Sequence, residues 1–206
     1  MRTYVYVDGF NLYFGALKGT SHRWLDLQRL FTLLLPGHRI DRIKYFTAHV
    51  TPRPNDPDQP LRQHIYLRAL RTLPNLDIVL GHYLTHAVMM PLANPAPGQS
   101  RYVRVLKSEE KGSDVNLATH FVHDAHCGLF DAAVIVSNDS DLLEAVKIVK
   151  GLGCRVGILN PHENPSRVLT REATFMKKIR GGPLSASHFP NPLTDAHGTF
   201  HKPTGW

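Results

Sequence analysis

Apolar and polar residues follow one another in blocks that predict strands leading into helices. Residues 132–136 form an uninterrupted apolar run that ends at a polar turn, 137–141. A short run of this kind predicts a strand buried on both faces of a parallel sheet. Apolar residues then recur at helical spacing from Leu142 to Val149, which predicts a helix directly after the turn.

The same order occurs at the start of the chain and is repeated along it. Residues 4–7 predict a strand, Asp8 ends it, and residues 12–16 continue as a helix. Because strands alternate with helices, we expect an α/β fold with a mostly parallel central sheet. Further helices are predicted over 25–35, 61–73 and 113–126, and further strands over 39–50, 77–84, 102–106 and 155–159.

Three segments give weaker patterns. Residues 89–100 are rich in proline and are predicted to be irregular, and the pattern over 169–179 is ambiguous. The composition changes after residue 180, where prolines interrupt any regular element. We therefore expect one domain over residues 1–180 and a Pro-rich tail without its own core over 181–206, which packs on the domain or on a partner.

Carboxylates stand where the predicted strands turn into helices. Asp8 follows the first strand, and Asp139 and Asp141 follow the strand over 132–136. Right-handed crossovers place such turns on one edge of a parallel sheet, where ligands bind in open α/β folds. Asp114 opens another helix, with Ser113 expected as its cap. If the two strands are neighbours, these carboxylates share one pocket.

Each carboxylate also has an ordinary structural explanation. Asp141 has Glu144 three residues later, which is the spacing of a capping box. Asp114 suits the first turn of a helix, and Asp8 before Gly9 suits a tight turn. Asp139 fits such a role less well, because one cap needs only one side chain. The argument for a site depends on all of them occurring together.

Electrostatics adds to this argument. Two like charges about 4 Å apart repel by roughly 4 kcal/mol at an effective dielectric constant of about 20. Clustered carboxylates therefore call for a cation or shared protons, and oxygen ligands suit Mg²⁺ or Mn²⁺. The formal net charge is +7, which is compatible with a nucleic-acid partner and with a plain solvated basic surface.

Three blocks of the sequence, in order, resemble the NYN domains of the PIN-like nuclease superfamily. They cover residues 7–12, 110–115 and 137–142, and the resemblance spans about residues 2–179. It implies a PIN-like three-layer α/β/α sandwich and a metal-dependent ribonuclease site. It also implies a set of acidic residues that would hold Mg²⁺ or Mn²⁺, and Asn11 would act as a polar helper. The acidic residues are Asp8, Asp114, Asp139 and Asp141.

The expected reaction is hydrolysis of RNA phosphodiester bonds by a metal-activated water, which leaves a 5′-phosphate and a 3′-hydroxyl. RNA is the expected partner. The candidates for contacts to it are Phe10 and Tyr13 by stacking, Lys111 at a phosphate and Asn138 in the turn. Arginines of the predicted helix over 61–73 are candidates for a basic rim: Arg62, Arg68 and Arg71.

Other classes of function were weighed against this one. A regulatory module that binds RNA or protein without catalysis would keep RNA binding in EDTA. An aspartyl phosphatase needs a second acid two residues after Asp8, where Phe10 stands. Zinc binding through the helical histidines is the weaker alternative to an unliganded exposed face: His120, His123 and His126.

Cysteine usage and apolar patterning bear on the compartment. The two cysteines, Cys127 and Cys154, show neither metal spacing nor a disulfide framework, which is typical of a reducing cytoplasm. No signal peptide is visible and no stretch is long and apolar enough to span a bilayer. We expect a cytoplasmic protein without membrane association, and a homo-oligomer is left open.

Overall fold

A six-stranded parallel sheet forms the centre of the computed structural model, which describes all 206 residues. The strand order is β3-β2-β1-β6-β7-β8, and every neighbouring pair is parallel. β1 and β6 are neighbours, so the two strands that carry the acidic turns lie side by side, as the site hypothesis required. The strands are β1 (Arg2–Asp8), β2 (Arg39–Thr47), β3 (Leu76–Leu80), β6 (Ala132–Val136), β7 (Arg155–Asn160) and β8 (Phe175–Lys178).

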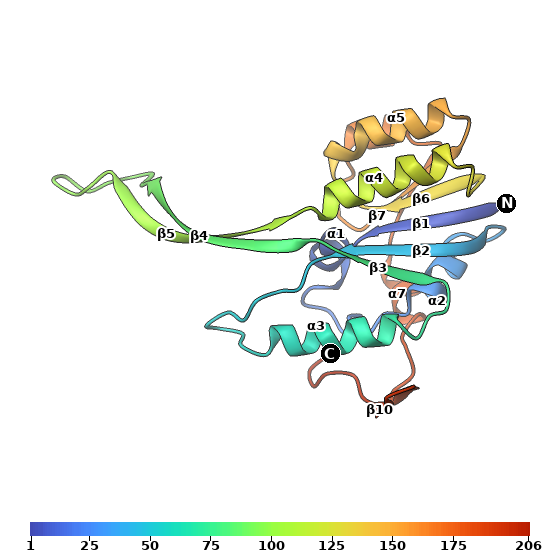
Figure 1. The fold of residues 1–206 in the computed structure, drawn as a ribbon, viewed down its shortest axis with the longest axis horizontal. Helices are drawn as coiled ribbons and strands as arrows, with labels where there is room; N and C mark the ends of the chain where they lie inside the picture. Colours follow the sequence, from blue (N-terminus) through green and yellow to red (C-terminus); the bar gives the residue numbers. More distant parts are fainter.

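Helices cover both faces of this sheet, which confirms the expected three-layer α/β/α sandwich (Figure 1). One face carries α4 (Ser113–His126), α5 (Leu143–Gly151) and α6 (Arg167–Glu172), and the other carries α2 (Leu27–Leu34) and α3 (Gln59–Leu70). Successive residues of a strand point to opposite faces. Accordingly, Val5 and Val7 belong to the core under α2, whereas Tyr6 belongs to the core under α4.

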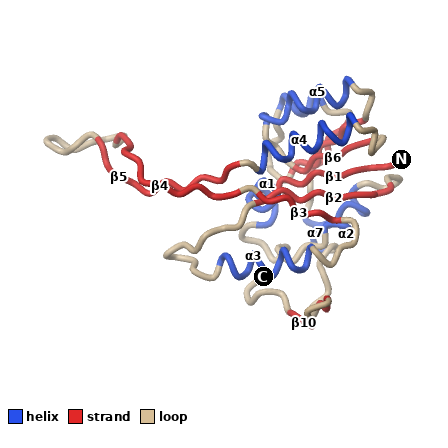
Figure 2. Tube along the Cα trace, in the orientation of Figure 1, coloured by secondary structure: helices blue, strands red, loops and turns tan.

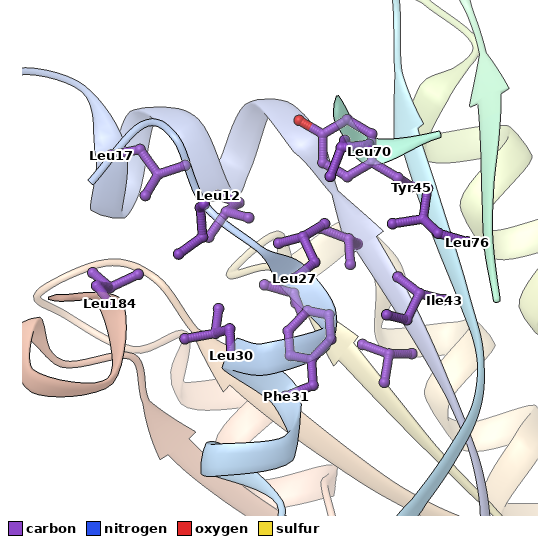
Figure 3. Packing of buried hydrophobic residues seen from close by; sticks show 14 of the residues in the cluster. Leu12, Leu17, Leu27, Leu30, Phe31, Ile43, Tyr45, Leu70, Leu76 and Leu184 are labelled. Carbon is purple, nitrogen blue, oxygen red and sulfur yellow. The ribbon is translucent and has the colours of Figure 1, made fainter. Parts of the chain in front are cut away.

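The helix α2 illustrates how the sequence builds one of these layers. The side chain of Asp26 accepts a hydrogen bond of 3.0 Å from the backbone N–H of Arg29 and so caps the helix. Four of its apolar residues recur at spacings of one, three or four positions and are buried in the core, whereas Leu33 is exposed; the buried residues are Leu27, Leu30 and Phe31 (Figure 3) and Leu34.

A long antiparallel hairpin projects from the domain, in a region where no hairpin was predicted. β4 (His82–Pro91) and β5 (Tyr102–Lys111) pair only with each other and extend away from the sheet (Figures 1 and 2). The predicted strand over 77–84 is thus two strands separated by Gly81, part of the supposedly irregular 89–100 is strand, and the strand over 102–106 continues to Lys111. Both faces of the hairpin are largely exposed, so no alternation of buried and polar residues marks it.

The segment after residue 180 folds back onto the domain. It contains α7 (Gly181–Ser185), β9 (Leu193–Asp195) and β10 (Gly198–Phe200), and its apolar side chains Leu184, Phe189 and Phe200 join the core under α2. The side chain of Arg68 on α3 holds it by an ion pair of 2.7 Å to Asp195. This segment therefore adds to the core of the domain, and it forms one short helix and two short strands where the prolines suggested no regular element.

Two local points complete the fold. The ambiguous segment 169–179 resolves into the end of α6 and the strand β8. None of the helices combines the length and the apolar character needed to cross a bilayer.

Candidate active site

The turn after β1 carries the most buried of the candidate carboxylates. Asp8 is 5% exposed, and its Oδ1 accepts a hydrogen bond of 2.9 Å from the backbone N–H of Asn11, which starts the short helix α1 (Gly9–Leu12). Its Oδ2 accepts a hydrogen bond of 3.0 Å from the hydroxyl of Ser137. Burial, together with the nearby charges of Asp114 and Asp139, raises the pKa of Asp8 to about 6 in spite of these hydrogen bonds.

Gly9 allows this turn to pack tightly. A Cβ atom at Gly9 would lie 2.7 Å from the ring of Tyr45 and 2.8 Å from the backbone oxygen of Phe46. Real Cβ atoms do not approach so closely, so only glycine fits here without a shift of the neighbouring strand β2. The position of Asp8 therefore depends on its glycine neighbour.

The turn after β6 is tied to the turn after β1. The side-chain Oδ1 of Asn11 accepts a hydrogen bond of 2.9 Å from the backbone N–H of Asn138. The hydroxyl of Ser137, which donates to Asp8, also accepts a hydrogen bond of 3.1 Å from the backbone N–H of Asp139. The side chain of Asn11 thus holds the backbone of the second turn, while its backbone N–H bonds to Asp8.

Within the second turn, the capping role falls on a different aspartate from the one expected. Asp139 accepts a hydrogen bond of 3.0 Å from the backbone N–H of Asp141 and caps the short 3-10 helix Ser140–Leu142. Asp141 is exposed and makes no cap. It is nevertheless close enough for its charge to help raise the pKa of Asp114.

The third carboxylate comes from the start of α4. Asp114 lies in the first turn, and burial and the charges of Asp139, Glu110 and Asp141 raise its pKa. Ser113 is not the cap of this helix, as was expected, because it already lies inside the helix. The N-cap is Gly112, which has no side chain, and Glu110 accepts hydrogen bonds from the backbone N–H and the hydroxyl of Ser113 at 3.0 and 2.7 Å.

These elements meet in one open, polar cavity of about 230 Å³, called here the acidic pocket. No lysine or arginine forms an ion pair with its carboxylates, so their mutual repulsion is uncompensated within the protein. Its lining residues are Asp8, Phe10, Asn11, Phe14, Glu110, Ser113, Asp114, Asp139 and His162.

The chemistry of this donor set fits a hard divalent cation. The acidic pocket offers carboxylate oxygens and one imidazole, but no group of three or more His, Cys, Asp or Glu side chains is arranged to hold a metal ion by itself. Mg²⁺ is commonly held by only one or two carboxylates, while waters and a substrate phosphate complete its shell. Asp8, Asp114 and Asp139 are therefore residues that could hold Mg²⁺ or Mn²⁺ together with such partners.

Several predicted residues lie outside the acidic pocket. Lys111 forms an ion pair of 3.4 Å with Glu109, and Asn138 uses its amide for hydrogen bonds to the backbone at Asn164 and Ser166. Arg68 is engaged with Asp195. Asn138 therefore shapes the turn, while Lys111 and Arg68 are committed to ion pairs.

The helical histidines form no metal site. His123 and His126 are exposed, but His120 lies near Lys44, with 3.3 Å between its Nδ1 and the lysine Nζ. Lys44 in turn forms an ion pair of 2.5 Å with the buried Asp124, which also accepts a hydrogen bond of 2.7 Å from the hydroxyl of Tyr6. The helix thus carries a buried polar network instead of zinc ligands.

A second cavity of about 140 Å³ adjoins the acidic pocket, and the two share Phe10 and Phe14 as lining residues. We call it the aromatic cavity. Arg23, Arg53 and Arg62 also line it, and Arg62 is paired with Asp56. Both predicted stacking residues, Phe10 and Tyr13, belong to it, together with Tyr45, Tyr66, Tyr83 and Trp206.

Sequence reasoning missed several residues of the acidic pocket, among them Phe14, Glu110 and His162. His162 follows β7, so the rule that located Asp8 and Asp139 at strand ends applies to it as well. Glu110 belongs to the same sequence block as Asp114, but its role depends on the end of β5 reaching back to the pocket. The aromatic cavity was also missed as a unit, because its residues are scattered from Gly9 to Trp206.

The fold and the pocket define a class: an α/β/α protein with carboxylates gathered at the carboxyl ends of its central parallel strands. The NYN domain profile matches residues 2–179. This chain belongs to the NYN domain family, whose fold is nuclease-like, and the resemblance noted in the sequence is confirmed.

Two known proteins are similar to it. 6-Hydroxy-3-succinoylpyridine 3-monooxygenase HspA of Pseudomonas putida (strain DSM 28022 / S16) is 32% identical over 236 aligned positions, which cover 100% of this chain and 75% of that protein. A protein of unknown function from Vibrio parahaemolyticus RIMD 2210633 has a crystal structure with a TM-score of 0.57 and 15% identity, covering 91% of this chain and 96% of that one. The similarity to the Vibrio parahaemolyticus protein is a similarity of fold.

Proposed function

We propose that this protein is a metal-dependent ribonuclease that hydrolyses RNA phosphodiester bonds in the acidic pocket. The observation that carries the proposal is the gathering of Asp8, Asp114, Asp139 and Glu110 around one open cavity without a cationic partner. Such an arrangement is costly for the folded protein unless a cation binds there. Membership of the NYN domain family supports the same reaction class.

Asp8, Asp114 and Asp139 are the residues assigned to hold Mg²⁺ or Mn²⁺, and the exposed Asp141 adds negative charge at the rim. When bound, the ion would lower the pKa of a water and neutralise charge on a phosphate. The water oxygen forms a bond to phosphorus while the bond to the 3′ oxygen breaks, and a proton passes to that oxygen. The products are a 5′-phosphate and a 3′-hydroxyl.

The protein's own residues fix the positions of the carboxylates and set their protonation. Asn11 and Ser137 fix the two turns, so the carboxylates on β1 and after β6 keep their relative placement. Without metal the pKa of Asp8 is raised to about 6, so this carboxyl must be free of its proton before it can bind a metal ion. His162 adds an imidazole to the lining of the pocket.

Cleavage of end-labelled single-stranded RNA tests the proposal. The assay compares EDTA, Mg²⁺ and Mn²⁺, with Asp8→Asn and Asp139→Asn beside the natural chain. The matched control is Asp58→Asn, an exposed aspartate that lines neither cavity. We expect cleavage that needs metal, is lost in both site variants and persists in the control. Cleavage that survives in both site variants contradicts the proposal, and RNA binding in EDTA without any turnover favours a non-catalytic RNA-binding module.

A second candidate function is oxygenation of a small heteroaromatic compound. It is favoured by the 32% identity to HspA across the whole chain and by a cavity with aromatic walls beside the acidic pocket. Such a reaction takes one oxygen atom from O₂ into the ring and reduces the other to water with two electrons from a donor such as NADH. Incubation of 6-hydroxy-3-succinoylpyridine with O₂ and NADH tests it, and loss of the compound that requires the protein would support it.

A further inference from the structure

The aromatic cavity has the dimensions and the walls of a binding site for one flat ring. Its volume is about 140 Å³, and an apolar cavity of roughly 150 Å³ accommodates a molecule of the size of benzene. Rings prefer to stack on aromatic side chains or meet them edge to face. Tyr66 and Trp206 have ring centroids 5.8 Å apart, and Phe10 and Tyr83 meet edge to face at 6.0 Å.

Polar groups without partners in this lining indicate that the ring carries hydrogen-bonding atoms. Tyr45 lines the cavity, and its hydroxyl forms no hydrogen bond within the protein but remains accessible to solvent. The amide oxygen of Gln59 and the indole N–H of Trp206 are buried and also lack partners. Buried polar groups are normally satisfied, and each orphan costs the folded state about 1–3 kcal/mol. A ligand with both donors and acceptors on its edge would remove part of this cost.

The charges around the aromatic cavity favour a ring attached to an anion. Arg62 is neutralised by Asp56, whereas Arg23 and Arg53 form no ion pair with a carboxylate. The guanidinium of Arg23 lies 5.6 Å from the ring centre of Trp206, so it stands beside the proposed ring. A phosphate or carboxylate next to the ring would therefore find a cation, and the acidic pocket itself would repel it.

The cavity is close to the carboxylates. It shares Phe10 and Phe14 with the acidic pocket, and the charge of Asp8 contributes to raising the pKa of Tyr45. A ring in the aromatic cavity and a group bound at the carboxylates would therefore share Phe10 and Phe14 as a common wall.

We propose that the aromatic cavity binds a planar heteroaromatic ring with adjacent N–H and C=O groups, joined to an anion, and that in an RNA substrate this ring is the base beside the cleaved phosphate. The assignment of this ring to an RNA base rests on the proposed ribonuclease function. A free pyridone-like compound offers the same ring chemistry. The residues assigned to supply the hydrogen-bonding groups are Tyr45, Gln59 and Trp206.

Calorimetric titration of the full chain in EDTA tests the ring proposal without any turnover. The probes are uridine 5′-monophosphate, 2-pyridone, which is a free ring with the same N–H and C=O pair, and ribose 5-phosphate, which has no ring of this kind. We expect at least one ring probe to bind at least 10-fold more tightly than ribose 5-phosphate. Equal affinity for all three, or no binding of either ring probe, would overturn the proposal.

Variants then localise the binding. Tyr45→Phe removes only the hydroxyl, and one hydrogen bond predicts a loss of affinity of about 2- to 10-fold. Trp206→Phe removes the indole N–H and is expected to act in the same direction. The matched control is Tyr102→Phe, which removes a hydroxyl from an exposed tyrosine on the β4–β5 hairpin. Weakening in the control as large as in Tyr45→Phe would place the binding elsewhere.

These measurements distinguish a nucleotide base from a free heteroaromatic compound as the source of the ring. They also separate the ring-binding proposal from the ribonuclease proposal. Preference for uridine monophosphate over 2-pyridone supports a nucleotide base, and the reverse preference supports a free heteroaromatic compound. Ring binding that remains in Asp139→Asn while the natural chain cleaves no RNA would retain the cavity and reject the ribonuclease. Metal-dependent cleavage that is unaffected by Tyr45→Phe, with no ring binding, would retain the ribonuclease and reject the cavity.

Discussion

The side-chain Oδ1 of Asn11 accepts a hydrogen bond of 2.9 Å from the backbone N–H of Asn138. This bond joins residues that are 127 positions apart in the chain and closes the gap between the turns after β1 and β6. Because Asp8 and Asp139 each lie within three residues of this link, it holds two carboxylates of the acidic pocket in place.

Replacement of Asn11 by alanine should loosen this link. The backbone N–H of Asn138 would lose its partner, and we expect the free energy of unfolding to fall by about 1–3 kcal/mol. RNA cleavage should fall by at least 10-fold because the carboxylates lose their mutual placement. Urea unfolding and the cleavage assay measure the two effects. Asn116→Ala is the matched control, since that amide makes only a 3.5 Å contact to the backbone oxygen of Leu80.

The raised pKa of Asp8 should make stability depend on pH. Its pKa is about 6 in the folded protein and about 4 when unfolded, so the folded state binds the proton more tightly. The contribution of Asp8 to stability is therefore present below about pH 4 and is lost as the pH rises to about 6. Two pKa units correspond to about 3 kcal/mol. Asp8→Asn should remove this decline in metal-free denaturant titrations, whereas an unchanged decline would contradict the assignment.

Divalent metal should stabilise the protein more strongly at high pH. Carboxylates must be ionised to bind a metal, and the pKa values of Asp8 and Asp114 are both raised. We expect Mg²⁺ or Mn²⁺ to increase the melting temperature at pH 8 much more than at pH 5. The increase at pH 8 should be lost in Asp114→Asn and kept in Asp58→Asn. An equal increase at both pH values would speak against binding at these carboxylates.

The buried network on α4 should matter for stability and not for catalysis. Lys44 and Asp124 are 13% and 3% exposed at their side chains and pair at 2.5 Å, and Tyr6 donates to the same carboxylate. Lys44→Met would leave Asp124 buried without its cation, and we expect a loss of about 3–5 kcal/mol. The double variant Lys44→Met/Asp124→Leu should recover much of this loss. Chemical unfolding gives the energies, and cleavage per folded molecule should remain unchanged.

Much of the sheet could be predicted because local runs of apolar residues identify its strands. The apolar run 132–136 is buried at every position, and the handedness of crossovers then places Asp8 and Asp139 on one edge. The β4–β5 hairpin could not be predicted in this way. Its strands bury neither face, and the prolines between residues 91 and 97 suggested an irregular segment where they only form the hairpin tip.

The hydrogen bonds that cap the helices of the candidate site could not be predicted from the sequence, for a different reason. Sequence spacing suggested that Asp141 and Ser113 were helix caps, but Asp139 caps the 3-10 helix and Glu110 accepts hydrogen bonds from Ser113, the first residue of α4. Which of several neighbouring acids bonds to a given N–H depends on backbone angles of a few residues, and spacing does not determine those. The exposed Asp141 illustrates the same limit, since its sequence position resembles that of Asp139.

The acidic pocket draws its walls from residue 8 through residue 162, from the first strand of the sheet to the loop after β7. During synthesis, β1 has only β2 beside it until β6 emerges, because the two central strands are separated by more than 120 residues. Contacts of such long range form late in folding. A growing chain therefore has no complete acidic pocket until β6, and then the loop after β7, have left the ribosome.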